Sequence, residues 1–288
     1  MSPATPADTG GESEYVLLAS GEDESAPGKK TESRLAHYLY GTSTILLFIA
    51  AWYAAAELDM INRTLLPSPG EVLSAFTAMA MSGELAEHVA ISMYRIGSGF
   101  ALGLVTAIPL GLMIARIRLV RAFLEPILEL IRPIPALAFL PLAILWFGVG
   151  EANKLFIMWF GTFFVIIVSV IEGVYNFDAV YLRVAKNLNA NQMQMFVYVL
   201  LPGVVPFVLE GMRQAVATAF RIIVSAEMIA AQAGIGFLIL NSALFYQTSR
   251  VIVGIIVLGF LGMTLDRLLI FITRNVFLRY KRTDEIAI

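Results

Sequence analysis

Long apolar stretches recur along this chain, and polar residues separate them into segments of similar length. A helix needs about 20 mostly apolar residues to cross a bilayer. Stretches of this kind lie at residues 38–56, 96–115, about 123–147, 155–171, 203 to about 226, and 251–272. The pattern predicts an all-α fold, a polytopic membrane protein with six transmembrane helices.

The third stretch differs from the others because it contains several prolines. Proline has no backbone N–H, and its ring clashes with the preceding turn of a helix. The sequence therefore predicts that the third span is kinked or broken. The residues responsible are Pro126, Pro133, Pro135 and Pro141.

The apolar segment 228–245 is ambiguous. Cytoplasmic loops of membrane proteins carry an excess of Lys and Arg. Six spans with the N-terminus inside leave only Arg63, Lys154 and Arg250 in the outer loops. A seventh span would move the basic C-terminus outside. We therefore expect both termini to be cytoplasmic, and residues from Gly234 onward to form a short re-entrant or interfacial helix on the outer side.

Two features near the second span concern packing. Pro67-Ser68-Pro69-Gly70 is typical of a turn, and residues 71–81 are expected to form a short amphipathic helix along the outer face.

The second span carries small residues four positions apart, which lets another helix approach closely. The stripe fits packing within the chain as well as packing between two copies. Its members are Gly99, Gly103, Ala107, Gly111 and Ala115.

Residues 1–34 are acidic and rich in Ser, Thr, Gly and Pro. Such a segment buries too little apolar surface to offset the entropy lost on ordering it. We expect a disordered cytoplasmic tail at residues 1–34 and a transmembrane domain at residues 35–288. A signal peptide is not expected, because no basic start is followed by an apolar run.

Composition narrows the functional classes. Hydrophobic residues make up 58% of the 288 residues and charged residues only 15%, whereas about a quarter of a soluble domain is charged. The net charge of −2 gives no reason to expect a nucleic-acid partner. Because the chain has no Cys and only two His, we expect no metal centre.

Charges within a span are costly, so they face a cavity or one another. The fifth span and its end place four charged residues within an arc of about 120°. Glu210 and Arg213 favour an i,i+3 ion pair with each other. For Arg221 and Glu227, a lining of a solute pathway and a structural pairing are both open.

The broken third span is the other candidate for a pathway. Broken helices expose backbone groups that must line a cavity or pack in protein. A purely structural kink is the alternative. With the residues of the fifth span, the candidate pathway residues are Arg132, Ile134, Pro135, Leu137, Arg221 and Glu227.

Residues 178–202, between the fourth and fifth spans, read DAVYLRVAKNLNANQMQMFVYVLLP. Apolar residues recur there at three- and four-residue spacing, which is typical of an amphipathic helix. Asn189 suits a left-handed helix end, and Pro202 is expected to end the second helical piece. The segment predicts a helix-turn-helix on the cytoplasmic surface, either a docking site for a soluble partner or a plain connector.

Arg183-Val184-Ala185, then Asn189, then Leu201-Pro202 occur in this segment at a spacing that resembles the EAA loop of ABC-importer permeases. Further motifs resemble the nitrate, sulfonate and taurine branch of that family. The resemblance spans residues 40–282. The additional motifs are Leu66-Pro67-Ser68-Pro69, Arg132-Pro133-Ile134-Pro135, Leu145-Trp146-Phe147-Gly148 and Ala226-Glu227.

Two positions depart from the family pattern. Arg183 replaces its Glu, and Asn189 replaces its Gly. Since Asn adopts the same left-handed conformation, the loop backbone should be retained. The change from Glu to Arg reverses a charge at the expected partner surface. A compensating acidic residue in the ATPase and a relaxed requirement for the Glu both fit this change.

The resemblance implies a permease subunit of an ATP-driven importer in the bacterial inner membrane. Its solute would be a small molecule, with an anion such as nitrate, bicarbonate, a sulfonate, taurine or an aromatic acid favoured. Implied partners are a second permease copy, two ABC ATPase subunits, an extracytoplasmic solute-binding protein and the lipid membrane. The ATPase is expected to dock on a coupling helix that includes Arg183, Val184, Ala185, Lys186, Leu188, Asn189 and Ala190.

ATP and Mg are expected in the partner ATPase and no cofactor in this chain, which is therefore not expected to be an enzyme. The only Gly-Lys pair, Gly28-Lys29, lacks the spacing of a phosphate-binding loop. A stand-alone secondary transporter or channel is the main rival. That class often shows internal repeats and paired broken helices, and neither is found. An intramembrane enzyme is a weaker rival, because no Cys or His lies within a predicted span.

Overall fold

The structure is a computed structural model that describes residues 27–58 and 62–284. All regular elements in this part of the chain are helical, which confirms the all-α prediction. The chain divides into two units, residues 1–58 and 59–288. The first unit contains helix α1 (Pro27–Glu57), which includes the predicted first span at 38–56.

Helix α1 begins earlier than the sequence suggests. Residues 27–34 belong to α1, although the pattern assigns them to the tail. A helix that is nucleated in an apolar run extends readily, because each added residue gains a backbone hydrogen bond. Residues 1–26 of the predicted tail lie outside the described residues.

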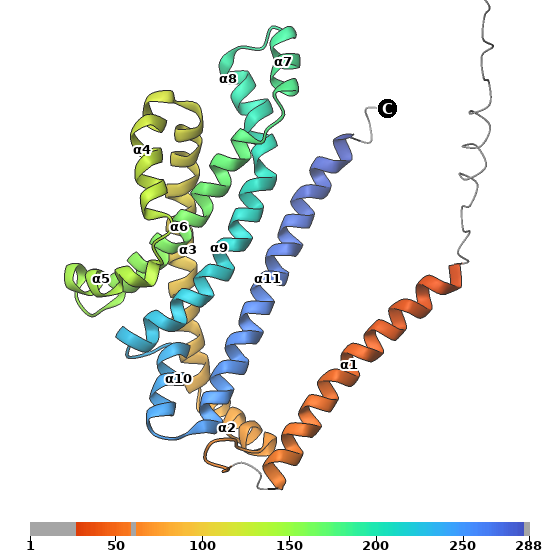
Figure 1. Cartoon of the computed structure of the whole chain (residues 1–288), viewed down its shortest axis with the longest axis vertical. Helices are drawn as coiled ribbons and strands as arrows, with labels where there is room; N and C mark the ends of the chain where they lie inside the picture. Colours follow the sequence, from red (N-terminus) through yellow and green to blue (C-terminus); the bar gives the residue numbers. More distant parts are fainter. Residues whose placement is uncertain (1–26, 59–61, 285–288) are drawn as a thin grey trace, which may run out of the picture. The chain divides into compact units, whose positions relative to one another are not determined.

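The second unit contains the remaining helices (Figure 1). They are α2 (Pro69–Met81), α3 (Glu84–Arg116), α4 (Arg118–Ile131), a 3-10 helix (Ala136–Phe139), α5 (Leu140–Phe147), α6 (Glu151–Tyr175), α7 (Ala179–Asn187), α8 (Gln192–Gln194), a π-helical turn (Met195–Leu200), α9 (Leu201–Ala230), α10 (Ile235–Leu244) and α11 (Thr248–Asp284).

Within the described residues, four helical segments are long and apolar enough to cross a membrane. They are α3, α6, the continuous helix from α8 through α9, and residues 248–273 of α11. A fifth span results if α4 and the helices that follow it count as one, and residues 42–57 of α1 form a shorter apolar helix. Several membrane spans are thus confirmed, and the number six stays a prediction.

The predicted third span is broken. Its two halves, Arg118–Ile131 and Ala136–Phe147, are bent by 90° relative to each other. The break follows Arg132, and Pro135 stands directly before the 3-10 helix. Pro133 and Pro135 have no backbone N–H to donate to the preceding turn, so the helix cannot continue in a straight line.

Helix α6 packs between α3 and α9 and forms the centre of the core. One buried cluster joins Ile96 of α3, Met158 of α6 and Ile223 of α9, together with Leu140 of α5. A second cluster joins α3 and α6 further along their length, with Ala215 contributed by α9. The three helices therefore form one packed layer around α6.

The small-residue stripe of α3 faces α6 in the same chain. A Cβ added at Gly99 would lie 2.3 Å from the Cβ of Met158, and one at Gly103 would lie 2.5 Å from the Oγ1 of Thr162. The stripe lets two backbones approach closely. Of the two packing roles left open by the sequence, the structure shows the one within the chain.

The two shorter predicted helices are present as α2 and α10. Helix α2 begins at Pro69, slightly earlier than predicted, because Ser68 and Glu71 form a capping box in which Ser68 N–H donates to Glu71 Oε2 at 2.8 Å. Helix α10 begins at Ile235, directly after Gly234. Their placement on the outer side of a membrane stays a prediction.

Pro202 does not end a helix, which corrects the prediction. Residues 192–230 form one continuous helix, and Pro202 lies in the first turn of α9. A π-helical turn, Met195–Leu200, immediately precedes it. Proline is tolerated in a first helical turn, and such wider turns occur within helices without ending them.

Replacing Gly99 by Ala is expected to destabilise the chain, because the added Cβ collides with Met158. Overpacking of this kind costs about 1–3 kcal/mol. The matched control is Gly97→Ala in the same helix, where nothing lies within 4 Å of an added Cβ. That control should be neutral or slightly stabilising, since Ala favours helices over Gly. Melting temperatures in detergent test this, and equal values for the two variants would contradict it.

Candidate functional site

The predicted helix-turn-helix is formed by α7, α8 and the turn between them. Asp178 caps α7 by accepting a hydrogen bond from Val180 N–H at 2.8 Å. The turn contains Asn189 at φ 61°, the left-handed conformation predicted for it. Asn191 and Gln194 then form a capping box at the start of α8. The local sequence therefore determines both helix starts and the turn that joins them.

The surface of this helix-turn-helix carries exposed apolar side chains. Ala185 is buried, whereas Tyr181, Val184 and Leu188 are exposed, Leu188 by 77% of its surface. Figure 1 shows α7 and α8 at one end of the second unit, with α2 and α10 at the other. All seven predicted docking residues lie in α7 or in the turn after it: Arg183, Val184, Ala185, Lys186, Leu188, Asn189 and Ala190.

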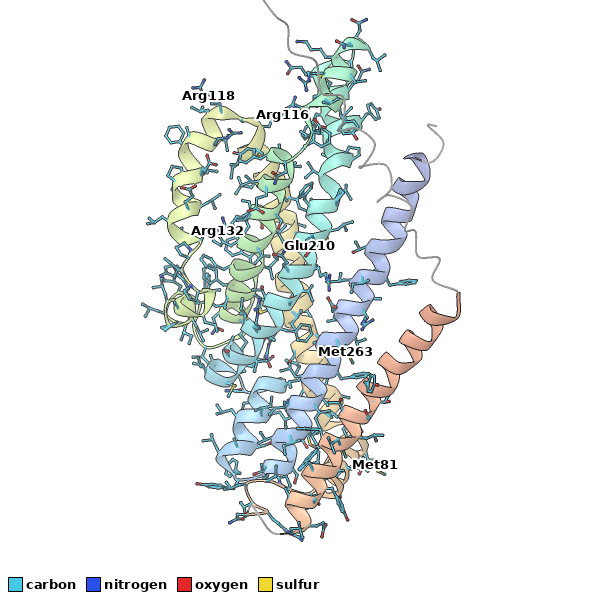
Figure 2. The ribbon with its side chains drawn as sticks, turned by 45° about the vertical axis from the view of Figure 1, so that its right-hand side comes forward. Met81, Arg116, Arg118, Arg132, Glu210 and Met263 are labelled. Carbon is cyan, nitrogen blue, oxygen red and sulfur yellow. The ribbon has the colours of Figure 1, made fainter. Side chains whose placement is uncertain are left out.

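Basic residues gather at the same end of the second unit. The Arg116 guanidinium lies 5.2 Å from the ring centroid of Phe196, in the π-helical turn after α8, and Figure 2 shows Arg116 and Arg118 at the upper end of the unit. Arg121 Nη2 donates to Ala115 O at 2.6 Å, at the last turn of α3, and its guanidinium lies 4.8 Å from the Tyr175 ring centroid. A cation that bonds the last carbonyls of a helix also stabilises its dipole. This clustering is what the distribution of basic residues along the sequence predicts for one face of the membrane.

A second region is a cavity of about 280 Å³ beside the break between α4 and α5. Its wall is formed by the residues around the break and by α6 and α9. Figure 2 shows Arg132 at the end of α4. Five of the predicted pathway residues line this one cavity: Arg132, Ile134, Pro135, Leu137 and Arg221.

The cavity carries an excess of positive charge. Arg221 Nη2 donates to Thr218 Oγ1 at 2.9 Å, and no carboxylate of the described residues lies within ion-pair distance of Arg221. Arg132 Nη2 is 3.8 Å from Glu172 Oε1, and both side chains are more than half exposed. Such an exposed, long pair contributes little. The cavity therefore has a mainly apolar wall, and its charged lining residues are Arg132 and Arg221.

Glu227 does not line this cavity, although it is among the predicted pathway residues. It is buried in a cluster of charged residues near the C-terminal end of α9, where it forms a structural pair. The predicted pair between Glu210 and Arg213 is wrong. Arg213 Nε donates to Asp266 Oδ1 of α11 at 2.9 Å, and Glu210 accepts from Gln214 Nε2 at 3.4 Å. The polar arc of α9 is wide enough to face different neighbours, so Arg213 meets α11 and Glu227 meets α3 and α10.

The buried charged cluster is centred on Arg95 of α3. Arg95 Nη1 donates to Glu227 Oε1 at 2.8 Å and to Ala233 O at 2.7 Å. Arg95 also binds Glu151 of α6 through both carboxylate oxygens, with Nε···Oε2 at 2.7 Å and Nη2···Oε1 at 2.5 Å. The side chains of Arg95 and Glu227 are nearly fully buried. A buried charge is tolerated only when paired and hydrogen-bonded, as both are here.

The same cluster holds the start of α10. Glu227 accepts from Ser92 Oγ and from Gly236 N–H, each at 2.9 Å. Ser92 Oγ in turn accepts from Ile235 N–H at 2.9 Å, and His88 Nδ1 accepts from Gly234 N–H at 3.0 Å. Three consecutive amides at a helix start, normally without partners, are therefore satisfied by side chains of α3 and α9.

Gly234 is required by this arrangement. Its φ of 118° lies in the region that favours glycine, and an added Cβ would lie 2.3 Å from the carboxyl carbon of Glu227. The backbone thus approaches the buried carboxylate closely only because no side chain intervenes. The sequence marks the Gly234-Ile-Gly236 segment as a helix start, and the structure gives the reason for it.

Ser92, Arg95 and Glu151 belong to no sequence motif and are not among the predicted site residues. Lys154, assigned to an outer loop, is buried near the start of α6, and its Nζ donates to Gly150 O at 2.9 Å. One sequence signal could have pointed to this cluster. Opposite charges lie near the ends of neighbouring predicted spans, and charged residues in such places pair with one another. No group of three or more metal-ligating side chains occurs among the described residues.

Glu227→Ala is expected to destabilise the protein strongly. The substitution removes one of the two carboxylates that bind the buried Arg95. It also removes the acceptor of the Gly236 N–H in the first turn of α10. Removing one partner of a buried pair costs about 3–5 kcal/mol. The matched control Asp266→Ala removes the partner of the half-exposed Arg213 and should cost about 0–1 kcal/mol. Thermal unfolding in detergent compares them, and losses of similar size would contradict the role of Glu227.

Comparisons with known proteins place this architecture in a family. Residues 107–278 match the family described as "Binding-protein-dependent transport system inner membrane component". The taurine transport system permease protein TauC of Escherichia coli (strain K12) is 34% identical over 228 residues, covering 77% of this chain and 83% of the relative. The putative aliphatic sulfonates transport permease protein SsuC of the same strain is 35% identical, covering 76% and 83%.

Two further comparisons agree. The nitrate import permease protein NrtB of Leptolyngbya laminosa is 32% identical, covering 66% of this chain and 68% of that protein. A solved structure of the MetNI methionine ABC transporter in an inward-facing conformation aligns with a TM-score of 0.56 at 18% identity, covering 64% of this chain and 92% of that chain, which shows a shared fold. The resemblance found in the sequence is confirmed: the chain belongs to the binding-protein-dependent inner membrane components, the permease subunits of ABC transporters.

Proposed function

We propose that this permease subunit carries a small anion inward, driven by an ATPase that docks on α7. The observation that carries the docking assignment is the exposed apolar face of α7, formed by Tyr181, Val184 and Leu188 at one end of the second unit. Exposed apolar groups clustered on a rigid helix are typical of an interaction site. ATP and Mg would bind in the partner, and this chain would supply the docking helix and the membrane path.

The assembly we propose contains two copies of this chain, two ATPase subunits and an extracytoplasmic solute-binding protein. The α7 end would face the cytoplasm, since it carries Arg116, Arg118 and Arg121 and positive residues favour that side. Helix α11 runs back towards this end, so a cytoplasmic C-terminus follows. The protein would then lie in the bacterial inner membrane with both termini inside.

Helix α9 supplies a mechanical link between docking helix and solute path. The continuous helix 192–230 starts at the turn after α7, passes Arg221 in the cavity wall, and ends beyond Glu227. A displacement of α7 by the ATPase would therefore be carried along one continuous helix to the cavity. Two states of such an element, biased by nucleotide and solute, are what a transport cycle requires.

The anion assignment depends on Arg221. Its guanidinium lines the cavity without a carboxylate partner among the described residues. Arg132, directly before the break, lines the same cavity. An uncompensated charge in a span is maintained where it faces a polar cavity or a charged guest. The names of three relatives, which specify taurine, aliphatic sulfonates and nitrate, agree with an anionic group in the solute.

Alanine at Leu188 is expected to weaken association with the ATPase, because it removes the most exposed apolar contact of α7. Truncating a central apolar contact costs about 1–3 kcal/mol, or roughly five- to a hundredfold in affinity. The matched control is Leu145→Ala on α5, which is equally exposed but distant from α7. Co-purification of the tagged chain with the ATPase encoded beside it measures the effect. Undiminished recovery with Leu188→Ala would overturn the docking assignment.

Replacing Arg221 by Gln is expected to reduce anion uptake into vesicles that contain the full transporter, by about tenfold or more, because the cavity loses its unpaired cation. Arg213→Gln on the same helix is the control, since Arg213 already pairs with Asp266 and does not line the cavity. Uptake is measured with labelled taurine, nitrate and an alkyl sulfonate as separate probes. Equal uptake by both variants for every transported probe would exclude Arg221 from the path.

Native mass spectrometry of the complex tests the assembly itself. Two copies of this chain with two ATPase subunits are expected. A stable single chain that transports solute without an ATPase would instead support the rival function, a stand-alone secondary transporter or channel.

A further inference from the structure

An apolar groove of about 620 Å³ lies beside the C-terminal end of α3. One wall is α3 from Ile108 to Ile117, and the other is formed by α8, the π-helical turn and the start of α9. Several of the apolar side chains in the wall are exposed, among them Met113 and Met193. At 1.5 Å per residue, the α3 wall is about 14 Å long. The groove is therefore long and apolar enough to hold part of a hydrocarbon chain.

The charged residue in the wall of this groove is Arg116. It is the last residue of α3, and its guanidinium lies 5.2 Å from the ring centroid of Phe196, which also lines the groove. Within the part of the chain that the structure describes, no carboxylate lies within ion-pair distance of Arg116. The other lining residues are apolar except for Gln192. The charge of Arg116 is therefore available to an anionic group at the end of the groove.

We infer that this groove binds an anionic phospholipid, with an acyl chain along α3 and the phosphate at Arg116. Helix α3 is long and apolar enough to span a membrane, and it ends at Arg116. The groove thus lies where the apolar span gives way to charged residues, as acyl chains give way to head groups in a bilayer. Basic pockets between membrane helices bind anionic head groups.

The charge at this end of the unit selects the kind of lipid. Figure 2 shows Arg118 at the same end as Arg116. A zwitterionic head group would bring its own cation close to these two arginines, and like charges oppose association. A lipid with a net negative charge is therefore favoured. The inference does not depend on where the ATPase docks.

Two other occupants fit the groove less well. A soluble partner approaches from the end of the unit, whereas Ile108 lies eight residues before the end of α3, about 12 Å along the apolar span. A second copy that met this groove in a two-fold interface would present the same surface. Such an interface would bring the Arg116 side chains of the two copies towards each other, with no carboxylate of the groove to separate them.

The test measures lipid binding by the purified full-length chain after its own lipid has been exchanged for detergent. Native mass spectrometry measures what the chain binds from an equimolar mixture of phosphatidylglycerol and phosphatidylcholine. The natural chain should prefer phosphatidylglycerol about fivefold, because one cation near a head group contributes about 1 kcal/mol. Arg116→Gln should remove most of this preference, whereas Arg116→Lys should retain it.

Matched controls separate the groove from its surroundings. Arg118→Gln removes an exposed cation at the same end that does not line the groove, so it should leave the preference nearly unchanged. Met113→Trp puts a large ring into the groove and should reduce the binding of both lipids. Leu102→Trp should not, since Leu102 lies on the same helix outside the groove and is 48% exposed against 46% for Met113. Melting temperatures in detergent show that each variant is folded.

Three results would overturn the inference. Equal effects of Arg116→Gln and Arg118→Gln would mean that diffuse charge attracts the lipid. Unchanged lipid binding by Met113→Trp would place the lipid outside the groove. A natural chain that retains neither lipid would show that no lipid site exists. If Met113→Trp then also converts two-copy species into single chains, the groove is an interface between copies.

Discussion

The buried carboxylate of Glu227 is the interaction on which the rest of the architecture depends. It lies at the end of α9, accepts from Arg95 and Ser92 of α3, and bonds the first turn of α10. Through Arg95 it is joined to Glu151 at the start of α6. Four helices therefore meet at one cluster, in which Lys154 Nζ lies 3.4 Å from Glu151 Oε1 and balances the charge. Arg95 and Glu227 are tolerated in the interior because each compensates the other, so the helix ends are fixed relative to one another.

Close packing extends this constraint along the helices. The glycines of α3 bring its backbone against α6, and buried aliphatic residues fill the space between α6 and α9. Hydrogen-bonded ion pairs therefore hold the C-terminal end of α9, and close packing against α6 holds part of its length. The continuous helix 192–230 begins just after the turn that follows α7, and its C-terminal half contributes Arg221 to the cavity wall. Under the proposed function, this helix connects the docking site with the solute path.

The break between α4 and α5 is the second feature that shapes the structure, because a mainly apolar cavity lies beside it. Prolines prevent a continuous helix there, and the bend of 90° leaves space that α6 and α9 complete. The cavity contains two arginines, one without a carboxylate partner among the described residues. Irregular backbone of this kind is tolerated in a membrane protein where it lines a cavity or is covered by protein.

The sequence by itself determined what depends on local chemistry. Apolar length predicts the spans, the prolines predict the broken helix, and Asn189 predicts the turn after α7, because each follows from the residue and its neighbours in the chain. It did not determine which distant groups meet. The pairs of Arg95 with Glu227 and of Arg213 with Asp266 join residues far apart in sequence. A helix face of about 120° reaches several neighbours, so only the tertiary packing of α3, α6, α9 and α11 decided which charge is buried and which lines the cavity.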